Sequence, residues 1–286
     1  MKRPNFLFIM TDTQATNMVG CYSGKPLNTH HIDQLAEEGI RFNAAYTCSP
    51  VCTPARAGLF TGIYANQSGP WTNNVAPGKN ISTMGRYFKD AGYQTCYIGK
   101  WHLDGHDYFG TGVCPPEWND EFWFDGANYL AELTEEQINL WRNGLNSVEE
   151  LQANNIDETF TWAYRISNRA IDFLQRPHPE DEPFLMVVSY DEPHHPFTCP
   201  VQYLEKYQDF YYGKRLRIRW WISPYIIASG RRPCRHQLKM AAGITITRFI
   251  SPVMTLWTIR LVVWLTHSPP NNARTHGSYI PLTMAR

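Results

Sequence analysis

The C-terminal part of this sequence contains no acidic residue. Residues 1–213 hold all 26 Asp and Glu together with 14 Lys and Arg, whereas residues 214–286 hold the other 12 basic residues. At the earlier frequency of acidic residues, an acid-free stretch this long would arise on the order of once in ten thousand chains. The net charge of zero therefore conceals two unlike regions, and we call residues 214–286 the basic tail.

The sequence also shows no recognisable export signal, and its number of cysteines is odd. Its first residues, MKRPNFLFIMTD, form an apolar run that Thr11 and Asp12 end too soon for a signal-peptide core with a cleavage site. Seven cysteines without such a signal favour reduced thiols over a disulfide framework. We therefore expect a cytoplasmic protein.

The basic tail contains no recognisable nucleic-acid motif and no clean membrane span. Its basic and aromatic residues suggest a patch for anionic partners. An apolar stretch near residues 249–266 suggests a membrane segment, but Pro252 and Arg260 interrupt it. We expect neither a nucleic-acid nor a membrane partner. Our preferred interpretation is translation in a shifted reading frame after about residue 213.

Residues 1–213 alternate short apolar runs with helical patterns. Such alternation predicts an α/β fold with a mainly parallel sheet covered on both faces, and 43% apolar residues can fill its core. The expected strands are residues 5–10, 93–98 and 183–190, and residues 41–46 are expected to form a strand or an extended segment. The expected helices are residues 30–38, a run from 52 to 61, residues 82–91 capped by Ser82, and residues 157–175. Residues 105–130 are expected to form a long excursion on the surface.

The most specific pattern is TCSPVCTPARAGLFTG, residues 47–62. It places Cys52, Pro54 and Arg56 at fixed spacing before a helix-like run. A lone cysteine is usually a small buried residue, and Cys48 suggests a metal pair or a disulfide. Neither alternative explains the proline and the arginine.

This pattern resembles the signature of type I sulfatases. The resemblance implies that Cys52 is oxidised to formylglycine by a maturation enzyme. It also implies that one hydroxyl of the hydrated aldehyde attacks the sulfur atom of the sulfate ester, and that the other hydroxyl later expels sulfate. Arg56 would contact the nucleophile and the sulfate oxygens. The implied fold is the alkaline-phosphatase-like α/β sandwich, present here as its N-terminal portion.

The same resemblance implies a divalent cation, Ca²⁺ by family and Mg²⁺ or Mn²⁺ as alternatives. Asp12 follows the first expected strand, as does the first metal-binding carboxylate of sulfatases. The family usually has a second Asp beside it, whereas this chain has Thr13 and Gln14. We expect Asp12, Thr13 and residue 52 to hold the cation, with less charge than usual.

Two histidine motifs complete the expected site. GKWH contains Lys100 and His102, which match the family's sulfate-contacting residues, and their spacing in an extended segment would place both on one side. In EPHHP, the family pattern selects His194 as sulfate ligand or proton donor and leaves His195 structural. Asn73 could reach the substrate, although a turn asparagine is the more ordinary reading.

The resemblance covers residues 4–210. Full sulfatases complete the metal site with a later Asp and its Asn or His neighbour, but no Asp follows Asp209. We therefore expect residues 1–213 to form an incomplete catalytic region with little or no activity of its own.

Two other functions compete with hydrolysis of a small sulfated substrate. A phosphonate or phosphodiester hydrolase would use the same signature and metal, since all these substrates are tetrahedral oxyanions. A non-catalytic protein would bind anionic partners through the basic tail, with an affinity that falls as salt rises.

Overall fold

The computed structural model describes residues 3–143, 148–179, 181–196, 198–204 and 278–283. Within these residues a parallel sheet has the strand order β2-β3-β1-β4. The strands are β1 (Phe6–Thr11), β2 (Gln94–Gly99), β3 (Phe184–Ser189) and β4 (Ser278–Thr283). The predicted parallel sheet is confirmed, and the first three strands lie within one or two residues of their expected bounds.

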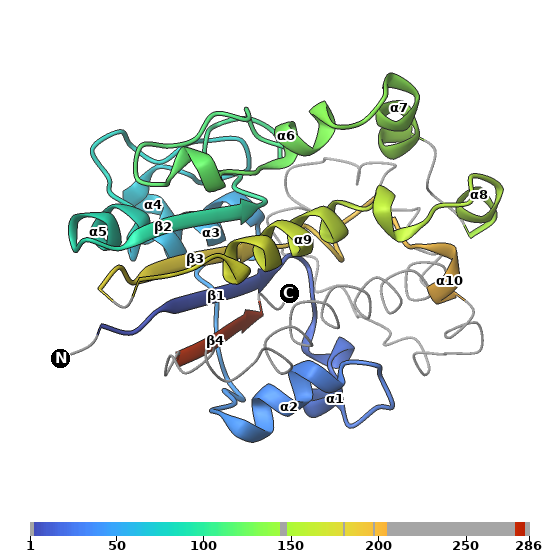
Figure 1. Ribbon diagram of the computed structural model, residues 1–286, viewed down its shortest axis with the longest axis horizontal. Helices are drawn as coiled ribbons and strands as arrows, with labels where there is room; N and C mark the ends of the chain where they lie inside the picture. The colour runs from blue at the N-terminus through green and yellow to red at the C-terminus, as the bar shows by residue number, and fades with distance from the viewer. Residues whose placement is uncertain (1–2, 144–147, 180, 197, 205–277, 284–286) are drawn as a thin grey trace, which may run out of the picture.

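Helices lie on both faces of the sheet (Figure 1). They are α1 (Gly20–Ser23), α2 (His30–Glu38), α3 (Cys52–Thr61), α4 (Ala65–Ser68), α5 (Met84–Asp90), α6 (Gly126–Ala131), α7 (Glu135–Asn143), α8 (Val148–Ala153), α9 (Trp162–Gln175) and α10 (Val201–Leu204), with 3₁₀ turns η1 (Thr16–Met18), η2 (Asp120–Phe122) and η3 (Glu158–Phe160). No helix among the described residues is long and apolar enough to cross a membrane.

Alternation along the buried strands separates the core into two layers. Met186 and Val188 of β3 pack with α9, whereas Leu185 and Val187 face the opposite layer, which includes Phe60 of α3. Successive strand side chains point to opposite faces, so a strand covered on both sides is apolar throughout. For this reason the apolar run PFLMVVSY, residues 183–190, predicts a buried strand.

The expected surface excursion at 105–130 is wrong. Phe109, Trp118, Trp123 and Phe124 are buried, and the two tryptophans pack around Tyr97 of β2 with ring centroids 5.0 and 5.5 Å away. These aromatic residues belong to the core, because burying their large rings stabilises a segment that has little regular structure.

Smaller boundary predictions also change. Residues 41–46 form no strand, and Ile40, Phe42 and Tyr46 are exposed. Helix α5 begins after Thr83 rather than Ser82, and α9 begins at Trp162, after the separate turn η3. In α9, Thr161 is the N-cap and its hydroxyl accepts from the amide of Tyr164. Most of the basic tail lies outside the described residues; β4 is the part of it that pairs with β1.

Candidate functional site

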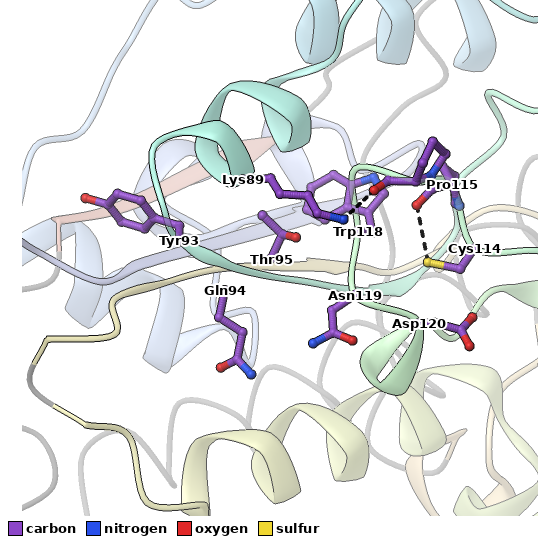
Figure 2. Close-up of a pocket in the computed structure, with 10 residues that line it drawn as sticks. Lys89, Tyr93, Gln94, Thr95, Cys114, Pro115, Trp118, Asn119 and Asp120 are labelled. Carbon is purple, nitrogen blue, oxygen red and sulfur yellow. Dashed lines mark hydrogen bonds between the residues drawn. The ribbon is translucent and has the colours of Figure 1, made fainter.

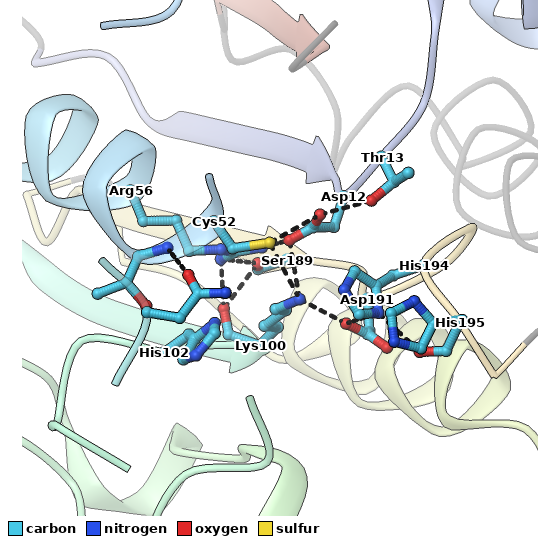
Figure 3. Close-up of polar contacts among 12 residues, drawn as sticks. Asp12, Thr13, Cys52, Arg56, Lys100, His102, Ser189, Asp191, His194 and His195 are labelled. Atoms are coloured by element: carbon cyan, nitrogen blue, oxygen red, sulfur yellow. Dashed lines mark hydrogen bonds and ion pairs between the residues drawn. The ribbon is translucent and has the colours of Figure 1, made fainter. Parts of the chain in front are cut away.

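Four segments distant in sequence meet where the parallel strands end. Asp12 follows β1, Lys100 follows β2, and His194 lies in the turn after β3. Cys52 is the first residue of α3, and its side chain points toward the same region (Figure 3). Sites in α/β proteins commonly form at this edge of the sheet, and the predicted meeting of these four segments is observed.

The amino end of α3 is held by a neighbouring loop. Its N-cap, Val51, has no capping side chain, and Oδ1 of Asn73 accepts instead from the backbone amide of Thr53 at 2.9 Å. Asn73 thus satisfies an otherwise unpaired helix amide beside Cys52. Burial raises the pKa of the Cys52 thiol, with the charge of Asp12 adding to the rise against Lys100 and Arg56.

Asp12 is the shared acceptor of the site. Its Oδ2 lies 2.8 Å from Lys100 Nζ and 3.3 Å from Arg56 Nη2, and its Oδ1 lies 3.4 Å from Cys52 Sγ. Burial alone would raise the pKa of the Asp12 carboxyl, but the Lys100 and Arg56 charges hold it well below its ordinary value. Asp12 is therefore an anion at every physiological pH.

Lys100 bridges two buried carboxylates. Its ammonium contacts Asp12 at 2.8 Å and Asp191 Oδ1 at 2.7 Å, and its side chain is wholly buried. Burial alone would lower the pKa of Lys100, but these two carboxylates raise it above its ordinary value. Lys100 is therefore a fixed positive charge 4.0 Å from Cys52 Sγ.

Arg56 links α3 to the ends of β2 and β3. Its side chain is fully buried, and its Nη1 donates to the carbonyl oxygen of Lys100 at 2.6 Å and to Ser189 Oγ at 2.9 Å. Tyr97 Oη also donates to that carbonyl at 2.6 Å. The guanidinium thus fixes the backbone that carries Lys100 as well as pairing with Asp12.

His102 is neutral and held by a second loop asparagine. Burial, with the Lys100 and Arg56 charges, lowers the pKa of His102 to about 3. Its Nε2 lies 3.0 Å from Oδ1 of Asn74, an acceptor, so Nε2 carries the proton and the buried Nδ1 keeps a lone pair. The expected extended alternation is wrong here, because φ of His102 is 57°, in the left-handed region.

His194 lies on the solvent side of the cluster. Its side chain is 12% exposed, its Nδ1 lies 2.6 Å from the carbonyl oxygen of His195, and its ring stacks on that of His195. Tyr108 borders two of the sulfate-contacting candidates, with its ring 5.5 Å from the His194 ring and 5.4 Å from Lys100 Nζ. The partly open side of the site therefore has one aromatic and one imidazole ring.

Asp12, Cys52 and His194 could hold a cation, since one ligand atom from each lies within 4.8 Å of the others. Thr13 donates its hydroxyl to Asp12 Oδ1 at 2.9 Å, and Gln14 Oε1 accepts from Thr11 while its buried Nε2 has no partner. A charged carboxylate beside residue 52 fits a hard cation once that residue offers an oxygen. The described residues thus fit one side of a cation site, with Asp12 as the carboxylate in this cluster.

Sequence reasoning missed the residues that hold the site in place. Asp191 pairs with Lys100, Ser189 joins Arg56 to Lys100, Asn74 holds His102, and Tyr108 lines the open side. The DE pair directly after the buried strand at 183–190 was a usable signal, because a carboxylate at a buried strand end needs a cation.

A cleft of about 500 Å³ lies at the opposite end of β2 (Figure 2). Gln94 and Thr95, at the start of that strand, line it with Asn119. The Lys89 ammonium donates to the carbonyl oxygen of Pro116 within it. This cleft is separate from the charged cluster.

A sequence profile of the Sulfatase family matches residues 4–234, which is more than half of the chain. The chain belongs to the sulfatase family. It is 88% identical over 212 residues to YidJ of Escherichia coli K12, described as an uncharacterized sulfatase, and the match covers 74% of this chain and 43% of YidJ. It is 31% identical over 197 residues to the N-acetylglucosamine-6-O-sulfatase of Bacteroides thetaiotaomicron, covering 68% of this chain and 31% of that enzyme.

Solved structures confirm the alkaline-phosphatase-like α/β fold of this sulfatase-family chain. One structure, in complex with its substrate D-glucosamine-2-N,6-O-disulfate, is 26% identical with a TM-score of 0.54, covering 75% of this chain and 40% of the other. The phosphonate monoester hydrolase of Agrobacterium radiobacter shares the fold, with 15% identity, a TM-score of 0.67 and coverage of 98% and 62%. The chain spans less than half the length of the two curated relatives.

Proposed function

We propose that this chain carries the nucleophile and sulfate-binding residues of a sulfuric ester hydrolase, with Cys52 converted to formylglycine. The observation that carries the proposal is the position of Cys52. Its Sγ lies at the start of α3, 3.4 Å from Asp12 Oδ1 and 4.0 Å from Lys100 Nζ. This sulfur stands where the oxygens of the hydrated aldehyde would be.

The unmodified thiol is a poor candidate for the nucleophile. A thiol reacts as its thiolate, and burial raises the pKa of Cys52 rather than lowering it. Oxidation by a formylglycine-generating enzyme replaces the sulfur with an aldehyde, whose hydrate supplies two hydroxyls. The fixed charges of Lys100 and Arg56 then serve the sulfate instead of a thiolate.

In the first step one hydroxyl of residue 52 attacks the sulfur, and the bond from sulfur to the leaving alcohol oxygen breaks. His194 supplies a proton to that oxygen, and Lys100 neutralises the sulfate charge. In the second step the other hydroxyl loses its proton. The bond from carbon to the sulfate oxygen then breaks, and water rehydrates the aldehyde. Water takes up the protons that the two hydroxyls lose. His102 is neutral at neutral pH and is suited to orient the nucleophile, because its Nδ1 keeps a lone pair.

Asp12 and an oxygen of residue 52 would hold the cation, with His194 at its border. When bound, a divalent cation such as Ca²⁺ would neutralise charge on the sulfate oxygens and favour ionisation of the attacking hydroxyl. Thr13 contributes by donating to Asp12 and fixing the orientation of that carboxylate.

We propose a sulfated sugar as the substrate class. One similar protein is named as an N-acetylglucosamine-6-O-sulfatase, and one similar solved structure holds D-glucosamine-2-N,6-O-disulfate as its substrate. Tyr108 on the open side agrees with this class, because aromatic side chains supply large apolar contact surfaces. Phosphonate monoester hydrolysis is the competing outcome of the assay below.

We further propose that the 286-residue chain turns over slowly by itself. Its metal cluster has a single carboxylate among the described residues, which gives weak cation binding. We also propose the division at residue 213, with the basic tail read in a shifted frame. The nucleotide sequence tests this: if no alternative frame there encodes a sulfatase-like continuation, the division is wrong.

The assay compares an aryl sulfate with the matching aryl phosphate and phosphonate, using protein co-expressed with a formylglycine-generating enzyme. Wild type should hydrolyse the sulfate ester slowly and preferentially, and Cys52→Ala should abolish that activity. Cys48→Ala is the matched control, because Cys48 is exposed and free. Preference for phosphonate, or equal activity in Cys52→Ala, would overturn the proposal.

A further inference from the structure

Asp191 is a buried carboxylate that the proposed reaction steps do not use. It lies two residues after the end of β3 and is 2% exposed. One of its oxygens, Oδ1, lies 2.7 Å from Lys100 Nζ and 3.9 Å from His194 Nδ1 (Figure 3). The same oxygen thus faces the proposed sulfate ligand Lys100 and the proposed proton donor His194.

Several positively charged groups compete for the carboxylate of Asp12. Its carboxylate contacts Lys100, Arg56 and Cys52, and it is also the carboxylate of the candidate cation site. A divalent cation on Asp12 would repel the Lys100 ammonium, which lies 2.8 Å from Asp12 Oδ2, and such repulsion is strong where water is excluded. A second carboxylate is needed to keep Lys100 charged and buried.

The backbone of Lys100 cannot move away to relieve this repulsion. Its amide donates to the carbonyl oxygen of Ser189, and its own carbonyl accepts from Arg56, Tyr97 and Ser189. Only the side chain of Lys100 can therefore move, and its ammonium already lies between Asp12 and Asp191.

We propose that Asp191 is a positioning residue that balances the charge of Lys100 and so leaves Asp12 to the cation. This inference rests on the proposed function, because it takes Asp12 as a cation ligand and Lys100 as a sulfate ligand. Asp191 also orients His194 through its turn, in which the His194 amide donates to the Asp191 carbonyl oxygen at 2.9 Å.

Replacing Asp191 by Asn separates this role from a general structural one. The amide keeps the shape and an acceptor for Lys100 but removes one negative charge. Lys100 then stays on Asp12 and competes with the cation, so cation affinity should fall at least about tenfold. Sulfate affinity should stay equal or rise, because the charge of Lys100 is less compensated. A folding defect would weaken both ligands together.

The experiment titrates the formylglycine-containing chain with CaCl₂ and separately with sodium sulfate by calorimetry at neutral pH, alongside thermal unfolding of each variant. Asp125→Asn is the matched control. Asp125 is equally buried and caps α6 outside the site, and Asn is also a good N-cap. Weaker Ca²⁺ binding with retained sulfate binding in Asp191→Asn, and unchanged binding in Asp125→Asn, supports the assignment.

Three other outcomes would overturn it. Wild-type Ca²⁺ affinity in Asp191→Asn would show that Lys100 does not compete for Asp12. Parallel loss of both ligands would show a structural role. A wild-type chain that binds no Ca²⁺, Mg²⁺ or Mn²⁺ would refute the cation half of the proposed function and this inference with it, whereas the first two results leave the proposed function intact.

Discussion

Asp12 Oδ1 and Cys52 Sγ lie 3.4 Å apart, although 40 residues separate them in sequence. Asp12 directly follows the first strand of the sheet, and Cys52 begins α3. Their contact is fixed by Arg56, which pairs with Asp12 from the first turns of the same helix. The geometry of the nucleophile therefore depends in part on the buried Arg56 guanidinium, and substitution of Arg56 tests this.

Arg56→Lys should destabilise the fold strongly. The substitution keeps the charge but loses the forked donors that reach Asp12, Ser189 and the carbonyl of Lys100. Disrupting a buried charge network costs about 3–5 kcal/mol, to be measured by urea unfolding. The control is Arg86→Lys, whose pair with Asp90 is exposed and should contribute little to stability. Equal losses in the two variants would contradict the role given to Arg56.

Gly99→Ala should be among the most damaging small substitutions. Gly99 has φ of 113°, and an added Cβ would lie 1.9 Å from the carbonyl oxygen of Ser189, the acceptor of the Lys100 amide. Gly24 also has positive φ, at 65°, but a Cβ there meets nothing within 4 Å. We expect Gly24→Ala to cost about 1 kcal/mol and Gly99→Ala several times more, by thermal or urea unfolding. A similar cost at both sites would mean that β2 and β3 separate easily.

Glu192→Gln should remove a pH dependence of stability. Burial, with the charge of Asp191, raises the pKa of Glu192 to about 8 from an ordinary value of 4.5. Because the folded state binds the proton of Glu192 more tightly than the unfolded state does, this group contributes its full stabilisation below pH 4.5. That contribution to the unfolding free energy is lost as pH rises through 8. The Gln variant keeps the acceptor for the Ala163 amide without titrating. Its unfolding free energy minus that of wild type should therefore rise between pH 4.5 and 8 by a few kcal/mol. A flat difference across this range would show that Glu192 ionises normally.

Asn73→Ala and Asn74→Ala should have different effects. Asn73 satisfies the Thr53 amide at the start of α3, so its loss should cost about 1 kcal/mol of stability. Asn74 holds His102, so its loss should lower turnover more than stability. Unfolding curves and aryl sulfate kinetics for both variants separate the two effects. A raised KM in Asn73→Ala with unchanged stability would instead favour the direct substrate contact that the sequence left open as an alternative to a turn asparagine.

Apolar runs and local motifs allowed much of this arrangement to be predicted. Strand β3 could be predicted because burial on both faces leaves no polar residue from Phe184 to Val188. The meeting of Asp12, Cys52, Lys100 and His194 followed from parallel strands whose carboxyl ends share one edge. Residues 105–130 could not be predicted, because their aromatic packing against Tyr97 has no periodic pattern. The left-handed backbone of His102 and the Asp191–Lys100 pair were also missed, since both depend on tertiary contacts.

The most direct test of the central claim is mass spectrometry of the peptide that spans residues 47–62, taken from protein co-expressed with a formylglycine-generating enzyme. We predict that Cys52 has lost its sulfur and gained an aldehyde that reacts with a hydrazide, while Cys48 in the same peptide stays a thiol. A peptide in which both cysteines remain alkylatable thiols would contradict the account.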